Sequence, residues 1–87
     1  MLPAPDSILV NRRANGSQRA LGHRVQNMRD LRGMSQRDLA NRLELVDSTQ
    51  LGDIEQGDLD PTLSTLREIA DCLEVPISDL LAGIERL

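Results

Sequence analysis

The sequence contains no phenylalanine, tryptophan or tyrosine, so its hydrophobic core has to be built from aliphatic side chains. Hydrophobic residues still make up 39% of the 87 residues. Leucine, methionine and alanine favour helices, whereas strands are enriched in aromatic and β-branched residues. The absence of aromatic residues therefore favours an all-α fold, and the length suits a single domain.

Other absences argue against whole classes of protein. No apolar run approaches the roughly 18 residues that a membrane span needs, and the N-terminal segment lacks the apolar part of a signal peptide, so a cytoplasmic protein without a membrane partner is expected. Cys72 is the single cysteine, and we expect an inert, half-buried thiol on a helix. His23, the single histidine, has no second ligand or nucleophile, so we expect an exposed side chain, no metal or cofactor, and no enzyme.

Lysine is also absent, and the ten basic residues, all arginines, are unevenly distributed. The formal net charge of −4 is unfavourable for nucleic-acid binding, because phosphate contacts supply most of the nonspecific affinity. Residues 1–42, however, carry eight arginines against three acidic residues, whereas residues 43–87 carry two arginines against eleven. The chain is electrically polarised, so its negative total does not exclude a nucleic-acid partner.

The pattern of apolar residues predicts a helical domain over residues 17–87 behind a flexible, arginine-containing N-terminal arm, residues 1–16. A short edge strand over residues 7–11 is an alternative within that arm. Apolar residues at helical spacing predict five helices. They run from Ser17 to a stop at Gly33, over 36–44, 48–56 and 62–73, and from Ile77 towards Leu87.

Two capping boxes mark the starts of the second and third predicted helices. Ser35 is followed three residues later by Asp38, and Asp47 by Gln50. At this spacing each side chain accepts a hydrogen bond from the other residue's backbone amide. Two short helices joined by a brief turn over residues 35–57 are typical of a helix-turn-helix.

Three motifs occur in order along this region: MSQRDLA opens the second predicted helix, IEQG closes the third, and PTLSTLREIADCLEV covers the fourth. With them, residues 21–81 resemble the Cro and phage-repressor type of helix-turn-helix family, also called Xre. The resemblance implies a five-helix, lambda-repressor-like fold and a DNA-binding transcriptional regulator. The turn at residues 43–46 is one residue longer than is usual in the family, and we expect an extra partial turn of the second helix to absorb it.

The resemblance also implies which residues contact double-stranded DNA, with the third helix in the major groove and the start of the second helix on phosphate. Gln36, with the backbone amides near Ser35, is the implied phosphate anchor, and Arg37 lies beside it. The implied base-reading residues are Ser48, Thr49, Gln50 and Asp53. Gln50 is also a capping partner, so its two roles compete.

Further arginines are expected to contact the DNA backbone or a minor groove, and these are Arg12, Arg13, Arg19 and Arg24. A solvated basic tail is the alternative. By the same resemblance, Arg29 and Glu55 form a structural pair that ties the first helix to the end of the third. Small residues, Ala40 and Gly52, are expected where the second and third helices cross, with Leu51 filling the core between them.

Two functions stay open at this point. The first is a transcriptional regulator that binds a palindromic operator as a homodimer, paired through the apolar C-terminal residues Leu80, Leu81, Ile84 and Leu87. The second is a protein-interaction module of the same fold, such as an antitoxin subunit or an adaptor. Acidic residues near the implied DNA-binding surface favour this second function, and they are Asp53, Asp58 and Asp60.

Overall fold

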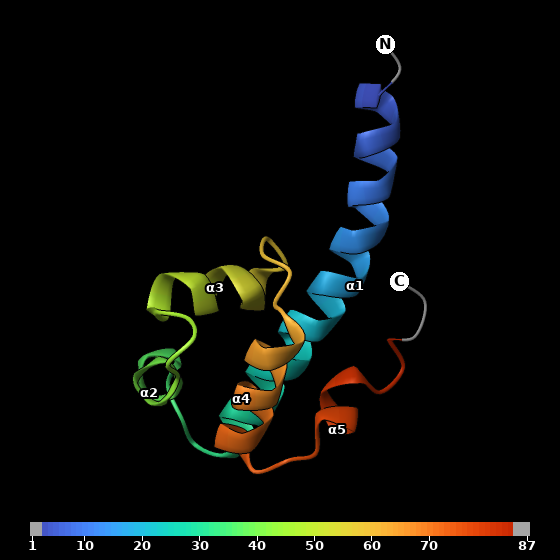
Figure 1. Cartoon of the computed structure of the whole chain (residues 1–87). Coiled ribbons are helices and arrows are strands. Elements are labelled where there is room, and N and C mark those ends of the chain that lie inside the picture. The colour runs from blue at the N-terminus through green and yellow to red at the C-terminus, as the bar shows by residue number, and fades with distance from the viewer. Residues whose placement is uncertain (1–2, 85–87) are drawn as a thin grey trace.

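The computed structural model describes the backbone of residues 3–84 and the side chains of residues 16–84. All regular elements in that part of the chain are helices, as Figure 1 shows. They run Pro3–Leu31 (α1), Gln36–Arg42 (α2), Ser48–Gln56 (α3), Leu63–Leu73 (α4) and Ile77–Leu81 (α5). The predicted all-α fold with five helices is confirmed.

Helix α1 is longer than the sequence suggested. It begins at Pro3, so residues 7–11 are helical, the edge strand is wrong, and Ser17 lies inside the helix instead of capping it. Pro3 and Pro5 lie in the first turn, where the backbone amides have no intrahelical partner and proline is tolerated. With 29 residues at about 1.5 Å each, α1 is about 44 Å long. Its first half projects beyond the other helices in Figure 1.

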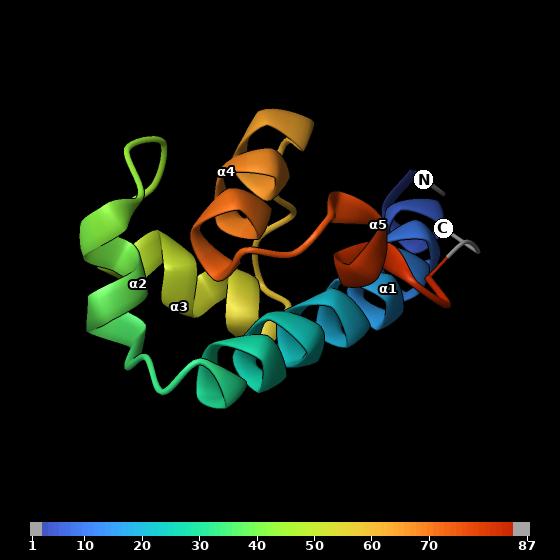
Figure 2. The ribbon, with the colours of Figure 1, turned by 90° about the horizontal axis from the view of Figure 1, so that it is seen from below.

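The second half of α1 packs mainly on α3 and also touches α4 and α5, while α2 packs on α3 and α4. Figure 2 shows α3 and α4 beside this half of α1, with α2 farther from it and next to α3. The core between them is aliphatic, as predicted. Its largest fully buried side chains come from all five helices and are Val25, Leu39, Leu51, Ile54, Ile69, Leu73 and Leu80.

Apolar residues at two helix ends are exposed, although they continue the helical spacing of apolar residues from which the helices were predicted. Leu31, the last residue of α1, is 84% exposed, and Leu63, the first residue of α4, is 60% exposed. In the last turn of α1 it is Arg29, not Leu31, that turns towards the other helices, because Glu55 binds it. The spacing of apolar residues can continue to the end of a helix, but a side chain there is buried only if another helix packs against it.

The turn between α2 and α3 differs from the expectation. Helix α2 ends at Arg42 instead of at residue 44, because Leu43 adopts an extended backbone conformation and its amide donates to the Ala40 carbonyl over 3.1 Å. The extra residue is therefore not absorbed by α2. It stays in the turn, where the amides of Glu44 and Leu45 donate to a carboxylate on α4.

Helix α5 is also shorter than expected, since it ends at Leu81. Ala82 leaves the helical conformation, and Gly83 has a left-handed φ of 78°. The Arg24 guanidinium of α1 then binds two of the carbonyl oxygens at this helix end, with Nη1 2.6 Å from the Asp79 oxygen and Nη2 2.9 Å from the Ala82 oxygen. This contact fixes α5 against α1.

The four apolar C-terminal residues proposed for dimerisation do not share one exposed face. Leu80 is fully buried in the core of its own domain, so its predicted place in an interface is wrong. Leu81 is 36% exposed, and Ile84 is half-buried against the same core. Leu87 lies outside the described residues.

Gly22 of α1 lies very close to the backbone of α3, and the sequence analysis did not single it out. A Cβ atom on Gly22 of α1 would lie 2.6 Å from the Ile54 carbonyl oxygen and nearer still to that of Glu55. At Gly52, where a close crossing was predicted, the nearest atoms belong to the Gln36 side chain at 3.6 Å, an ordinary contact. The glycine that permits close helix packing is therefore in α1.

We predict that Gly22→Ala destabilises the protein, because backbone carbonyls of α3 would have to move to admit the methyl group. The expected loss is about 1–3 kcal/mol in the free energy of unfolding, measured by urea denaturation. Gly52→Ala is the matched control and should gain up to about 1 kcal/mol from helix propensity. Equal effects of the two substitutions would contradict the close approach of α1 and α3.

Candidate nucleic-acid interface

The two capping boxes predicted from the sequence are confirmed, and they hold the first turns of α2 and α3. In α2, the Asp38 amide donates to Ser35 Oγ and the Ser35 amide donates to Asp38 Oδ2, both over 2.9 Å. In α3, the Gln50 amide donates to Asp47 Oδ1 over 2.8 Å and the Asp47 amide to Gln50 Oε1 over 3.0 Å. The hydrogen bonds from Ser35 also lower the pKa of the Asp38 carboxyl.

A polar groove lies between the start of α2 and the exposed side of α3. Its volume is about 360 Å³, and it is open to solvent. Two of the predicted phosphate-contacting residues and three of the predicted base-reading residues line it together. The complete lining is Gln36, Arg37, Ser48, Thr49, Gly52, Asp53 and Gln56. Among these, Gln56 was missed by the sequence analysis, although it lies one α-helical turn after Asp53.

The fourth predicted base-reading residue, Gln50, is not part of this groove. It lines a second hollow of about 610 Å³ around the α2–α3 turn, together with residues 43–48. Its side-chain oxygen is occupied by the capping hydrogen bond from the Asp47 amide. Of the two competing roles, the capping role is the one seen in the structure.

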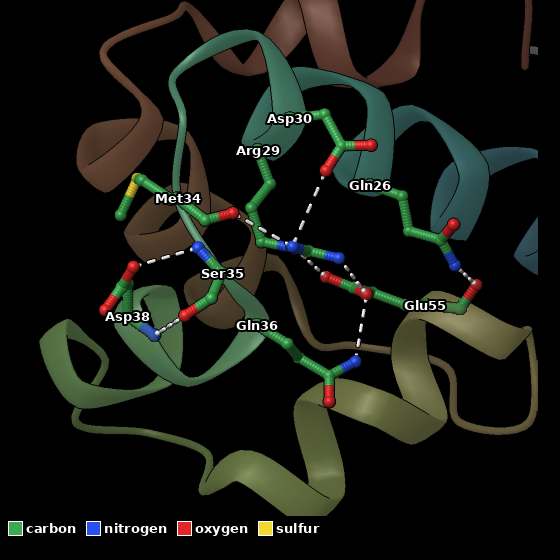
Figure 3. A network of polar contacts seen from close by, with 8 residues as sticks. All are labelled: Gln26, Arg29, Asp30, Met34, Ser35, Gln36, Asp38 and Glu55. Carbon is green, nitrogen blue, oxygen red and sulfur yellow. Dashed lines mark hydrogen bonds and ion pairs between the residues drawn. The ribbon is translucent and has the colours of Figure 1, made fainter.

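Glu55, at the end of α3, is the centre of a buried polar network (Figure 3). Only 3% of the residue is exposed. Arg29 Nε donates to Glu55 Oε2 over 2.9 Å and Arg29 Nη2 to Glu55 Oε1 over 3.1 Å, a bidentate pair. This pair was predicted, and its hydrogen bonds raise the pKa of Arg29 despite partial burial.

Other members of the network were not foreseen. Gln36 Nε2 donates to Glu55 Oε1 over 3.0 Å, and Gln26 Nε2 donates to the Glu55 carbonyl oxygen over 3.2 Å. Arg29 Nη1 also donates to the Met34 carbonyl oxygen over 2.9 Å. Gln26 lies three residues before Arg29, on the same face of α1, and that spacing was the available signal. The network joins α1, the start of α2 and the end of α3.

The contact between Gln36 and Glu55 changes how the predicted phosphate anchor is understood. The side-chain nitrogen of Gln36 already donates one of its two hydrogens to Glu55, and the Ser35 backbone amide donates to Asp38, so the Ser35 amide is not available to a phosphate. The amides of Gln36 and Arg37 lie in the first turn of α2, where amides lack intrahelical partners. These two amides are therefore the better-placed backbone donors.

The four arginines expected at the DNA backbone lie in different surroundings. Arg24 is bound to the end of α5, as described above, and is not free. Arg19 is exposed and lies across Gly57 at the end of α3, where a Cβ on Gly57 would be 2.6 Å from Arg19 Cγ. The side chains of Arg12 and Arg13 lie outside the described residues, while their backbone belongs to the projecting half of α1.

The three acidic residues that favoured a protein partner lie close in sequence but differ in exposure. Asp53 is half-buried in the groove wall, whereas Asp58 and Asp60 are exposed in the loop between α3 and α4. The Asp58 amide donates to the Asp53 carbonyl oxygen over 2.8 Å, which closes the end of α3. Asp53 is therefore the acid in direct contact with the groove.

Cys72 and His23 lie where the sequence predicted. Cys72 is half-buried on α4, with its Sγ 3.7 Å from the Arg42 carbonyl oxygen, and burial together with the nearby Glu68 raises the pKa of its thiol. His23 is exposed on α1. Among the described residues, no group of three acidic, histidine or cysteine side chains could hold a metal ion. No helix in this part of the chain is long and apolar enough to cross a membrane.

We predict that Glu55→Gln costs about 3 kcal/mol in the free energy of unfolding, because it removes the buried counter-charge of the half-buried Arg29. The matched control is Asp30→Asn, which removes the other acid near Arg29, at 3.7 Å but 72% exposed. An exposed pair contributes about 0–1 kcal/mol, so the control should change little. Urea denaturation gives both values, and similar losses would contradict a special role for the buried pair.

Comparisons with known proteins agree with this geometry. The helix-turn-helix family model matches residues 25–80, which include all of α2, α3 and α4. The HTH-type transcriptional regulator DdrOP3 of Deinococcus deserti is 32% identical over 65 residues, or 75% of this chain and 50% of that protein. The chain thus spans half the length of this relative.

A solved structure shares the fold. The restriction-modification controller protein C.AhdI from Aeromonas hydrophila superposes with a TM-score of 0.71 at 24% sequence identity, over 76% of this chain and 94% of that one. The family match, the motifs and the paired helices α2 and α3 lead to one conclusion: the chain belongs to the Cro and phage-repressor type of helix-turn-helix family, a class of DNA-binding transcriptional regulators and not of enzymes.

Proposed function

We propose that this protein is a sequence-specific, DNA-binding transcriptional regulator whose helix α3 enters the major groove. The observation that carries the proposal is the groove between α2 and α3, which five of the candidate residues line together. In this docking mode, the recognition helix presents its first turns to the bases and the preceding helix contacts the DNA backbone. The relative named as a transcriptional regulator supports the regulatory role.

The roles of the groove residues follow from their chemistry. Ser48 and Thr49, exposed in the first turn of α3, donate to or accept from base edges. Asp53, one turn further along, accepts from the N4 amino group of cytosine. Arg37 and the amides at the start of α2 contact phosphate. Gln50 contributes less than its residue type suggests, because its oxygen caps α3.

Arginines outside the groove add sequence-independent affinity in this proposal. The net charge of −4 and the acids near α3 make such help necessary, because phosphate attraction dominates nonspecific binding. Arg19, exposed beside the end of α3, and the sequence-predicted Arg12 and Arg13 supply it. Arg24 is left out because its guanidinium holds α5.

Selection from a random double-stranded DNA library tests the proposal directly. Purified protein at low salt should enrich a motif with two-fold symmetry. Affinity for that motif should fall by orders of magnitude between about 50 and 200 mM salt, as phosphate contacts require. Failure to enrich any motif at low salt would contradict the proposal.

We predict that Asp53→Asn changes the preferred base at one position of each half-site from cytosine to adenine. Asparagine pairs with adenine through N6 and N7, whereas aspartate accepts from cytosine N4. Repeating the library selection with the variant measures this change. The matched control is Asp60→Asn, which removes the same charge from the exposed loop and should alter affinity but not the motif. An unchanged motif with Asp53→Asn would exclude Asp53 from base reading.

We further propose a homodimer that docks two α3 helices about one DNA turn, or about 34 Å, apart on a palindromic operator. Leu81, Ile84 and Leu87 are the residues proposed for the interface. Leu81 is 36% exposed and ends α5, next to the half-buried Ile84. Since Leu80 belongs to the core of its own domain, it is no longer part of this proposal.

For the dimer, we predict that Leu81→Glu shifts the protein towards monomer in sedimentation at high micromolar concentration, because a charge would be buried in the interface. Leu63→Glu is the control, since Leu63 is 60% exposed on α4, away from α5. It should leave the distribution unchanged. A monomeric parent protein at that concentration would refute the interface.

The second candidate function is a protein-interaction module of the same fold. The half-buried Asp53 and the exposed Asp58 and Asp60 favour it, because acids beside α3 repel phosphate. The two functions differ in their salt response. A module that recognises a protein would bind DNA weakly at every salt concentration and enrich no motif.

A further inference from the structure

The lengthened turn between α2 and α3 is held by a carboxylate from another helix. Glu68 of α4 accepts two hydrogen bonds from consecutive backbone amides: Glu44 N to Oε2 over 2.7 Å and Leu45 N to Oε1 over 3.0 Å. Both carboxylate oxygens are used, one for each amide. Hydrogen bonds to an ionised acceptor are stronger than neutral ones, so this pairing constrains the turn more than a single neutral bond would.

A second contact from the same face of α4 lies just before the turn. Cys72, four residues after Glu68 and therefore one helical turn along, places Sγ 3.7 Å from the Arg42 carbonyl oxygen at the end of α2. Leu43, between these contacts, is buried in the core. The end of α2 and the start of the turn are therefore attached to α4 over consecutive residues.

The position of the turn determines where α3 begins. Only Val46 and the capping residue Asp47 separate the amide of Leu45 from Ser48, the first residue of α3. The far end of α3 is fixed independently, by the pairing of Glu55 with Arg29. A helix of nine residues held at both ends has little freedom to shift, and Glu68 supplies the constraint at the end that carries Ser48 and Thr49.

We infer that Glu68 is a positioning residue for DNA recognition: by fixing the turn, it sets the placement of the first turn of α3 relative to α2 and so determines sequence-specific affinity. This inference rests on the proposed function. Glu68 touches no DNA in this scheme. It acts through the turn amides, which makes its removal selective: base contacts suffer, whereas phosphate attraction, which depends on charge, persists.

The test compares Glu68→Gln with the matched control Asp71→Asn. Both remove one negative charge from α4, and Asp71 is an exposed residue on the same helix. In Glu68→Gln, one acceptor oxygen is replaced by an amino group that cannot accept a hydrogen bond. Affinity is measured for the selected motif and for a random-sequence duplex of equal length, with urea denaturation to correct for the folded fraction. Amide chemical shifts of Glu44 and Leu45 report whether the hydrogen bonds are present.

Glu68→Gln should lower affinity for the motif by roughly ten-fold relative to Asp71→Asn, the equivalent of losing one charge-assisted hydrogen bond. Binding to the random duplex should be the same for both variants, and the amide shifts of Glu44 and Leu45 should move only in Glu68→Gln. Glu68→Asp keeps the charge but shortens the side chain, so it should fall between the parent and Glu68→Gln.

Equal motif affinity for Glu68→Gln and Asp71→Asn would overturn the inference, as would an equal loss on the motif and the random duplex. Failure of the proposed function has a different signature. A parent protein that enriches no motif would remove the recognition role of Glu68 along with that function. The amide shifts would still show whether Glu68 holds the turn.

Discussion

The carboxylate of Glu55 is the constraint on which the arrangement of the first three helices depends. Only 3% of Glu55 is exposed, and a buried charge has to be paired and hydrogen-bonded, because isolated charges are strongly disfavoured away from water. Arg29 from α1 and Gln36 from α2 meet this requirement together. The start of α2, the end of α3 and the last turns of α1 therefore have to converge on one point, and the groove between α2 and α3 opens beside it.

Backbone packing and polar pairing reinforce each other in this region. Gly22 lets α1 approach the final turn of α3 so closely that a side chain would not fit between them. That approach brings the Arg29 side chain within reach of Glu55. At the other end of α3, two backbone amides of the preceding turn donate hydrogen bonds to Glu68 of α4. Helix α3 is thus anchored at its end by α1 and at its start by α4.

Much of the fold followed from local patterns in the sequence. The bounds of α3, both capping boxes and the aliphatic core were predicted correctly, and so was the pair of Arg29 with Glu55, through the family resemblance. The start of α1 was not predicted correctly. Prolines are tolerated in the first turn of a helix, but in a sequence whose helix start is unknown they look like helix breakers. The end of α2 was misjudged because the amide of Glu44, the expected last residue of α2, donates instead to Glu68, 24 residues away.

The sequence by itself determined the number of helices, the capping boxes of α2 and α3, and the family, because these depend on periodicity and on hydrogen bonds between residues three or four apart. Only the tertiary structure decided which candidate side chains share the groove. Gln36 donates across 19 residues to Glu55, and Arg24 donates to the Ala82 carbonyl oxygen, 58 residues along the chain. Such long-range partners are set by how the helices pack, and a side chain that looks free in the sequence can already be bound.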